Sequence, residues 1–190
     1  HKKTKSFTIC RKLLFCLNFW NRRRDCGNIL FMKEILLGLL RIFMGWIFFW
    51  PFLDKLLGLK FATETGKGWI DGFSPTTGFL SFATKGPFEE FFKSLAGNPL
   101  IDWIFMIGLF GIGISLILGI GIRLASYSGV LMFLLMYVAV LPPEHNPFID
   151  EHIIYAIMLL LLPVLNAGDY LGYGKSWKKS KLVSKFSILK

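Results

Sequence analysis

Residues 124–165 read LASYSGVLMFLLMYVAVL, then PPEHNPFIDEH, then IIYAIMLLLLPVL. The first and third pieces are apolar. Each can form most of a membrane-spanning helix, because a hydrocarbon core of about 30 Å needs roughly 20 apolar residues in a helix. The middle piece carries three acids and two histidines but no Lys or Arg. We therefore predict a membrane hairpin whose turn, residues 142–152, lies at the surface of the bilayer.

The composition of the whole chain also indicates a membrane protein. Of its 190 residues, 54% are hydrophobic and the mean hydropathy is +0.55, which is high for a soluble domain. The apolar residues fall into blocks that predict spans at about 35–59, 100–120, 124–141 and 152–171. Two of the three links are short. We therefore predict an all-α integral membrane protein, an up-down four-helix transmembrane bundle formed by one domain, residues 32–173.

The net charge of +10 comes from the two ends of the chain. Residues 1–31 hold eight Lys or Arg against Asp25, and the tail after Leu171 holds six lysines. Positive charge beside membrane spans marks the cytoplasmic side, which argues against a nucleic-acid partner. We predict a multi-pass protein of the cell membrane, with both termini and the basic tail 174–190 in the cytoplasm. The link 60–99 and the turn 142–152 then face outside.

The first 31 residues stand apart from the rest of the sequence. They hold all three cysteines (Cys10, Cys16 and Cys26), so thiol–disulfide chemistry and cysteine-ligated iron–sulfur or zinc sites are excluded for residues 32–190. Met32 opens the run into the first span. We predict that residues 1–31 are a basic extension, either non-native or disordered. The alternative is a basic arm that contacts anionic lipid.

The long link 60–99 is rich in aromatic residues, among them Trp69. Within it, residues 87–97 begin with Pro and end with Gly, which is typical of a helix. Their aromatic and aliphatic side chains share one face: Phe88, Phe91, Phe92 and Leu95. We predict a short amphipathic helix that lies in the outer interface of the membrane.

Two basic residues fall inside the first predicted span. An ionisable residue within a span usually faces the protein interior and serves a function, but a long side chain can also extend to the head groups. Both interpretations stay open for Arg41. Lys55 faces either the outer mouth of the bundle or the head groups. In the second span, Gly111, Ser115 and Gly119 recur every four residues and predict a ridge for helix packing.

The turn 142–152 and the residue one helical turn beyond it are the main candidates for chemistry. Three interpretations of Glu144, His145, Asp150 and His152 stay open: a proton relay, a metal site with two histidines and an acid, and simple helix capping in water. Tyr155 either extends a relay or anchors the helix in the interface. The sequence contains no phosphate-binding loop, no Ser/His/Asp hydrolase signature, and no histidine pair on facing spans for a haem.

Several stretches of the sequence resemble the DoxX/DoxD-like membrane proteins, and the likeness covers residues 32–173. The stretches are 74–80, 83–87, 97–103, 118–125 and 142–155, together with Arg41 and Gly45. The family includes the large subunit of thiosulfate:quinone oxidoreductases. The resemblance implies a four-helix membrane protein that oxidises thiosulfate to tetrathionate outside the cell and passes the electrons to a membrane quinone. It also implies a small, separately encoded DoxA-like partner subunit.

The resulting hypothesis is a membrane-bound oxidoreductase subunit with quinone as the electron acceptor and with no bound metal or nucleotide. Glu144, His145, Asp150 and His152 are its candidate catalytic residues, managing protons. The candidate residues for binding thiosulfate or quinone are Arg41, Lys55, Trp69, Lys85 and Tyr155. One alternative is a non-catalytic membrane anchor or assembly subunit of a redox complex, and another is a small transporter. A homo-oligomer is compatible with each.

Overall fold

The computed structural model of the chain is all-helical in the part that it describes, residues 2–143, 146 and 148–189. It divides into two units, His1–Leu36 and Leu37–Lys190. Helix α1 (Lys2–Leu57) belongs to both: its first part forms the helical backbone of the first unit, and its last part enters the second. All packing described below is within the second unit.

Three helices are long and apolar enough to cross a membrane: Leu30–Leu57 within α1, α4 (Pro99–Leu118) and α5 (Ile122–Ala139). They match the first three predicted spans and indicate a multi-pass membrane protein. The fourth apolar helix, α6 (Glu151–Val164), has 14 residues and a length of about 21 Å at 1.5 Å per residue.

The predicted fourth span, 152–171, extended too far at its C-terminal end. Pro163 lies within the last turn of α6, where it supplies no backbone N–H. Asn166 then adopts a left-handed conformation with φ of 50°, which ends the helical run. The chain continues as the short 3₁₀ helix η3 (Ala167–Asp169). Proline and a left-handed residue in close succession therefore set the end of α6.

The ends of the other two inner helices are set by local capping. Asn98 caps α4 by accepting a hydrogen bond from the Leu100 amide at 3.0 Å, and Pro99 takes the first helical position. At the other end Gly119 has φ of 79°, a conformation that glycine adopts without strain. These signals keep the turn from α4 to α5 to three residues, so the two helices are antiparallel neighbours.

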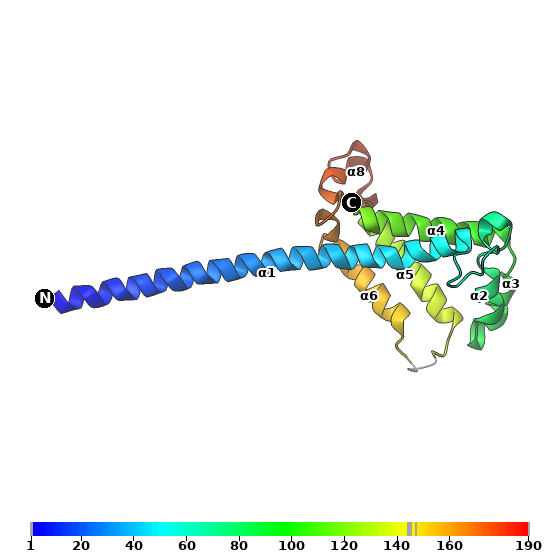
Figure 1. The fold of residues 1–190 in the computed structure, drawn as a ribbon, viewed down its shortest axis with the longest axis horizontal. Helices are drawn as coiled ribbons and strands as arrows, with labels where there is room; N and C mark the ends of the chain where they lie inside the picture. The colour runs from blue at the N-terminus through cyan, green and yellow to red at the C-terminus, as the bar shows by residue number, and fades with distance from the viewer. Residues whose placement is uncertain (1, 144–145, 147, 190) are drawn as a thin grey trace. The chain divides into compact units, whose positions relative to one another are not determined.

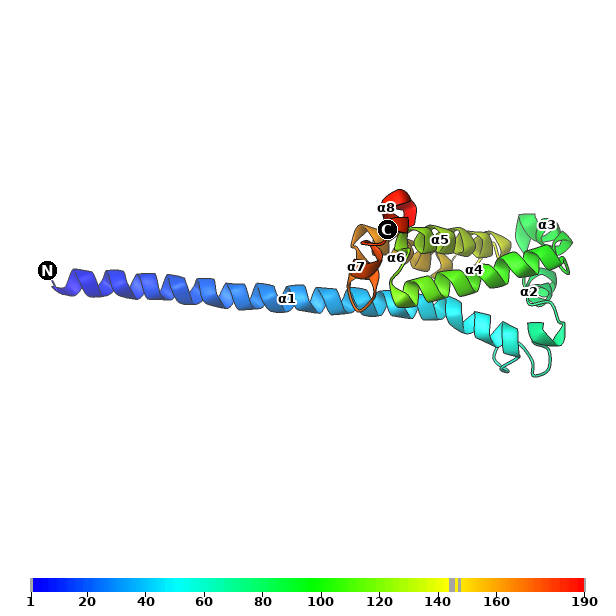
Figure 2. The same ribbon diagram turned by 90° about the horizontal axis from the view of Figure 1, so that it is seen from above.

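The four helices meet at Gly129 of α5. A Cβ atom there would lie 2.7 Å from Leu159 of α6, 3.1 Å from Phe48 of α1 and 3.5 Å from Ile112 of α4. The buried core surrounds this crossing, and Figures 1 and 2 show α4, α5 and α6 lying side by side. A residue without a side chain is what lets all three neighbours approach one backbone.

The predicted packing ridge on α4 was only partly correct. The helix packs through Gly113, where a Cβ would lie 2.9 Å from Phe49 of α1, and through Gly108, which faces Met132 of α5. Gly111 has nothing within 4 Å of its Cβ position. The four-residue spacing therefore identified small residues on α4 but not the face that contacts the other helices.

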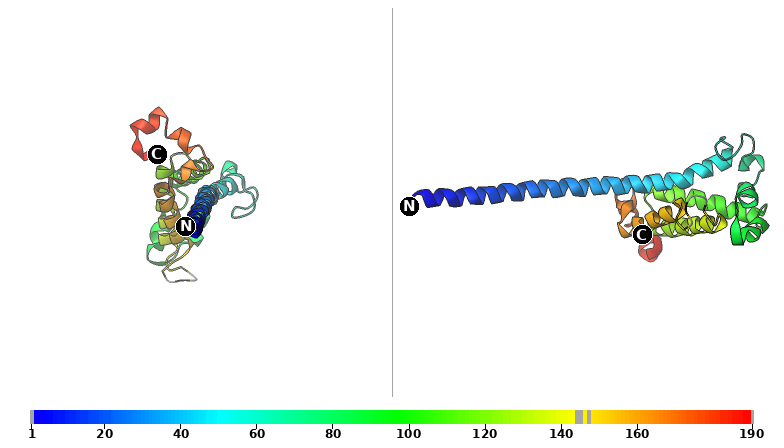
Figure 3. Two further views of the ribbon diagram at one scale, coloured as in Figure 1. Left: turned by 90° about the vertical axis from the view of Figure 1, so that its left-hand side faces the viewer. Right: turned by 90° about the horizontal axis from the view of Figure 1, so that it is seen from below.

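The connections gather at the two ends of the bundle, as Figures 1 to 3 show. The elements at one end come from the long link: η1 (Trp69–Asp71), α2 (Thr77–Phe82), η2 (Gly86–Phe88) and α3 (Glu89–Ser94). The elements at the other end follow α6 and η3: α7 (Gly174–Trp177), α8 (Lys181–Lys185) and η4 (Ser187–Leu189). We call these the link end and the tail end.

The predicted amphipathic helix 87–97 is present in a shorter form, as η2 followed by α3. Phe92 is buried in a small cluster with Leu80 of α2 and Ala139 of α5. Phe88 and Phe91 are exposed. The predicted apolar face is therefore divided: one part attaches the link to the end of α5, and the other faces outward.

Candidate functional site

The link end contains a recess because α6 does not reach as far toward this end of the bundle as α5 does. The His152 ring, in the first turn of α6, lies against Phe133 with a centroid separation of 6.0 Å. Phe133 is six residues before Ala139, the last residue of α5, so α5 extends past His152 by roughly 9 Å at 1.5 Å per residue. The space beyond His152 is therefore walled by the end of α5 and not filled by α6.

Asp150 and His152 form a pair at the base of this recess. Asp150 caps α6 by accepting hydrogen bonds from the amides of His152 (3.1 Å) and Ile153 (3.3 Å). Its second oxygen, Oδ2, lies 2.7 Å from His152 Nδ1. The side chains are only 10% and 15% exposed. Because Nδ1 is held by Asp150, Nε2 is the ring nitrogen left for a ligand.

A cavity of about 630 Å³ lies over the pair. Its lining comes from the end of α2 with the residues after it, from Val140 directly after α5, from described residues of the turn 142–152, and from the first turn of α6. The polar lining residues are Lys85, Asn146, Asp150, Glu151 and His152. The apolar ones are Phe82, Ala83, Val140, Pro143, Ile149 and Ile154. The cavity lining is mostly apolar with a few polar groups, which is typical of a small-molecule site.

Hydrogen bonds hold in place the two loop segments that line this cavity. The amide of Lys85 donates to the Ala139 carbonyl at 2.9 Å, which attaches the segment after α2 to the end of α5. In the turn, the Tyr137 hydroxyl donates to the Phe148 carbonyl at 2.8 Å. The Asn146 side chain accepts from the amides of Phe148 and Ile149. Loops that are attached in this way can hold a ligand in one orientation.

The structure brings together three of the residues predicted from the sequence: Lys85, Asp150 and His152. Tyr155 lies one turn further along α6, packed on Phe133 with ring centroids 5.5 Å apart. Glu144 and His145 lie outside the described residues. Within the part of the chain that is described, no group of three His, Cys, Asp or Glu side chains is placed to hold a metal ion.

The other three predicted residues lie outside this cavity. Trp69 packs edge-on against Trp103 of α4, with centroids 4.6 Å apart, and so attaches η1 to that helix near its start. Lys55 lies near the end of α1, beside the buried Asp54. Asp54 itself accepts hydrogen bonds from the amides of Phe61 and Ala62 and so closes the turn after α1.

Arg41 lies at the tail end and is fully buried. Its Nη1 donates to the carbonyl oxygens of Leu116 and, at 2.8 Å, of Ile117, in the last turn of α4. Its Nη2 donates to Tyr170 and Leu171 at 3.1 and 2.9 Å. Carbonyl groups at a helix end lack partners within the helix, so the guanidinium satisfies them. Arg41 therefore joins α1, α4 and the segment after η3, and its role here is structural.

Two polar residues of the link end were not singled out by sequence reasoning. Asp102, in the first turn of α4, is buried and accepts hydrogen bonds from the hydroxyls of Ser74 (2.8 Å) and Thr76 (2.5 Å). Asn146 orders the turn that walls the cavity. Asn146-Pro147 is a recognised turn signal and could have been used. Asp102 carries no such signal, because its partners lie 26 and 28 residues away.

Chemically, the site offers a carboxylate-oriented imidazole beside a mostly apolar cavity that a lysine also lines. An imidazole held in this way can exchange a proton with a bound ligand at Nε2. Comparisons of the chain with protein families, with curated proteins and with solved structures found no match. The resemblance drawn from the sequence therefore stays a prediction.

Proposed function

We propose that the chain is the membrane subunit of a thiosulfate:quinone oxidoreductase of the DoxX/DoxD-like kind, and that the cavity at the link end receives the quinone ring. The observation that carries this proposal is the Asp150–His152 pair, recessed by roughly 9 Å at the base of a mostly apolar cavity. A water-soluble substrate would not need a cavity with apolar walls between helices that are long enough to cross a membrane. A lipid-soluble carrier with a polar ring would use both features.

The cavity fits such a ring in size and lining. Its volume of about 630 Å³ lies within the usual range of roughly 300–1,000 Å³ for small-molecule sites. Phe82, Val140 and Ile154 supply apolar contacts, and His152 supplies Nε2, which donates when the ring is protonated. When bound, a quinone takes up two electrons and two protons. His152 would hold one proton at Nε2, and Asp150 would keep the ring oriented and stabilise its charged form.

Thiosulfate is the proposed electron donor. Joining two thiosulfate ions through a new S–S bond gives tetrathionate and releases two electrons, which matches the requirement of the quinone. Lys85 is the lysine of the cavity lining, and we assign the contact with thiosulfate to it. The small DoxA-like subunit is part of the proposal, as the separately encoded partner that the resemblance implies.

The proposed topology is a four-span bundle in the cell membrane with both termini in the cytoplasm. α6 by itself is shorter than a span, but η3 extends it to the level of the α4–α5 turn: a Cβ on Gly168 would lie 2.8 Å from the Gly119 carbonyl oxygen. Arg123, in the first turn of α5, and the six lysines after Leu171 support a cytoplasmic tail end. The cavity then opens on the outer side.

The test is reduction of a short-chain quinone analogue by thiosulfate, with the protein in liposomes and with and without the small subunit. We expect turnover for the wild type with its partner, and a loss of about a hundredfold for His152→Gln, since general acid–base groups contribute at least that much. Glu64→Gln is the control, because Glu64 is an exposed acid of the same end, paired with Lys67. Full turnover of His152→Gln would remove the pair from the reaction.

The same experiment separates the alternatives. If the chain is a non-catalytic anchor, turnover does not depend on His152. The small subunit would then reduce the quinone equally well with His152→Gln and with Glu64→Gln. The transporter hypothesis depended on Arg41 as a polar group inside the membrane. The four carbonyl contacts of Arg41 take away that support, since its guanidinium nitrogens Nη1 and Nη2 are already used.

A further inference from the structure

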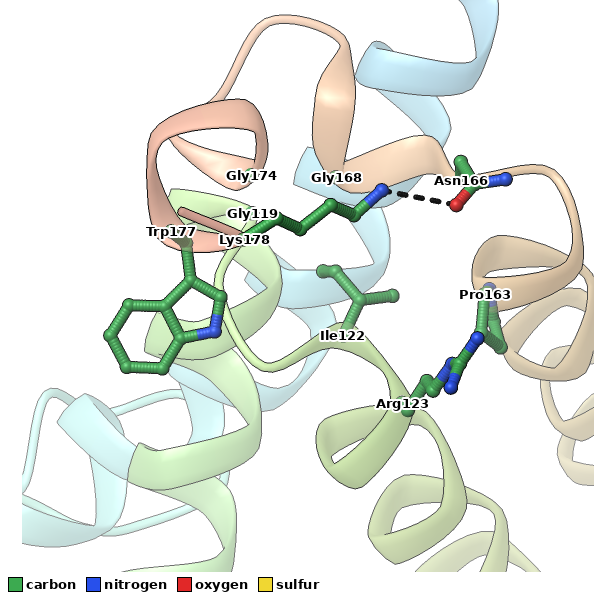
Figure 4. A pocket seen from close by; sticks show the side chains of 9 residues that line it. All are labelled: Gly119, Ile122, Arg123, Pro163, Asn166, Gly168, Gly174, Trp177 and Lys178. Carbon is green, nitrogen blue, oxygen red and sulfur yellow. Dashed lines mark hydrogen bonds between the residues drawn. The ribbon is translucent and has the colours of Figure 1, made fainter. Parts of the chain in front are cut away.

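A second cavity lies at the tail end and plays no part in the proposed reaction. Its volume is about 340 Å³, and it lies where α4 ends, α5 begins and α6 ends. Figure 4 shows Lys178 of the α7 segment extending over Ile122 toward Asn166, with the Trp177 ring on one side and Arg123 and Pro163 on the other. Three backbone positions without side chains complete the lining: Gly119, Gly168 and Gly174.

Two basic side chains line this cavity, Arg123 and Lys178. Lys178 is held in place by Asn166 at 3.0 Å and by Asp169 at 2.8 Å. Asp169 is the only acid after residue 151, whereas six lysines follow it in the sequence. The sequence after residue 151 therefore keeps a net positive charge, six lysines against one acid, and an anion is the ligand that this charge favours.

The position of the cavity narrows the choice of anion. It begins where the apolar helices end, which is the depth of the lipid head groups. Ile122, Pro163 and the Trp177 ring give it an apolar side. The indole Nε1 donates to the Leu189 carbonyl at 2.6 Å, which fixes the ring in place. Tyr173, Phe186 and Ile188 of the same end are exposed, as is typical of a surface in contact with a membrane.

We propose that this cavity binds the phosphate head group of an anionic phospholipid from the leaflet at the tail end. Arg123 and Lys178 contact the phosphate, and Ile122, Pro163 and Trp177 contact the glycerol and upper acyl region. A free phosphate ion would use the charges but not the apolar side. Phospholipid phosphate uses both, and basic pockets between membrane helices on the cytoplasmic side are suited to such head groups.

The test uses purified full-length protein in detergent, to which phosphatidylglycerol or phosphatidylcholine is added in steps, with retained lipid measured by native mass spectrometry. We expect tighter retention of phosphatidylglycerol. Arg123→Gln and Lys178→Gln should each weaken it about fivefold, which corresponds to the ~1 kcal/mol of a basic residue near an anionic surface. Since loss of Lys178 also breaks its pair with Asp169, circular dichroism of both variants in detergent checks that each keeps the fold.

Two matched controls separate the cavity from general attraction. Lys67→Gln removes a lysine of the link end that is likewise paired, to Glu64 at 2.6 Å, and should leave retention unchanged. Lys185→Gln removes a tail lysine outside the cavity and should have a much smaller effect than Arg123→Gln. The proposal is overturned if Lys185→Gln and Arg123→Gln weaken retention equally, if both lipids are retained equally, or if inorganic phosphate displaces phosphatidylglycerol.

Discussion

The guanidinium of Arg41 donates to the carbonyl oxygen of Ile117 at 2.8 Å, 76 residues away in the sequence. With the carbonyls of Leu116, Tyr170 and Leu171, this contact places one side chain at the junction of three segments. A buried carbonyl left without a donor costs about 1–3 kcal/mol. We expect Arg41→Met to lower the free energy of unfolding by about 3 kcal/mol or more.

The measurement for Arg41 is denaturant or thermal unfolding in detergent, followed by circular dichroism. Arg41→Lys should recover part of the lost stability. Its ammonium group keeps the positive charge, but it lacks the planar guanidinium fork and cannot reach all four carbonyl oxygens. Lys60→Met, at an exposed position of the link end, is the control and should unfold like the wild type. Wild-type stability of Arg41→Met would show that the helix ends are satisfied in another way.

Gly129 provides a second test of the packing. Any side chain there meets Leu159, Phe48 and Ile112, and overpacking a close helix contact costs typically 1–3 kcal/mol. We expect Gly129→Ala to lower the free energy of unfolding by about 1–3 kcal/mol and Gly129→Leu to prevent assembly of the bundle. Gly111→Ala on α4 is a matched control, because nothing lies within 4 Å of its Cβ. It should be neutral or stabilising, since alanine favours helices.

Sequence periodicity and length were enough to place the three long apolar helices, because each is a local property of its own residues. The end of α6 was partly readable: Pro163 is visible in the sequence, but the left-handed Asn166 that follows it depends on the packing around it. The recess at the link end is not readable in this way. It results from the offset between the start of α6 at Glu151 and the end of α5 at Ala139, which only the assembled bundle defines.

The sequence likewise predicted only some of the residues of the candidate site. Asp150 and His152 were predicted because ionisable residues beside apolar spans are uncommon, and Lys85 was predicted as a cation of the outer link that could bind an anion. The same reasoning could not separate them from Arg41, whose role depends on carbonyl groups 75 to 130 residues away. Trp69 was likewise grouped with the site because the link is aromatic, although its partner is Trp103. Residue type alone identifies candidates, whereas their partners come from long-range contacts.

We expect Asp102 to keep the long link 60–99 folded against α4. It accepts hydrogen bonds from Ser74 and Thr76, and the Ser74 hydroxyl in turn accepts from the Thr77 amide at 3.1 Å, at the start of α2. Asp102→Ala leaves both hydroxyls without their acceptor, at a cost of about 1–3 kcal/mol. Under the proposed topology, we expect faster cleavage of residues 60–99 by a protease added outside liposomes. Asp71→Ala is the control: Asp71 accepts the Gly68 amide three residues away, a local contact whose loss should change cleavage little.

Asp150 combines two roles that substitution can separate. It caps α6 through the amides of His152 and Ile153, and its other oxygen holds His152 Nδ1. Asparagine caps as well as aspartate, so Asp150→Asn should unfold like the wild type, while Asp150→Ala should lose about 1 kcal/mol. Asparagine has no negative charge to stabilise a protonated imidazole. Under the proposed function, Asp150→Asn should therefore reduce kcat for quinone reduction by at least about tenfold. If Asp150→Asn reduces kcat no more than Glu64→Gln does, Asp150 acts only as the cap of α6.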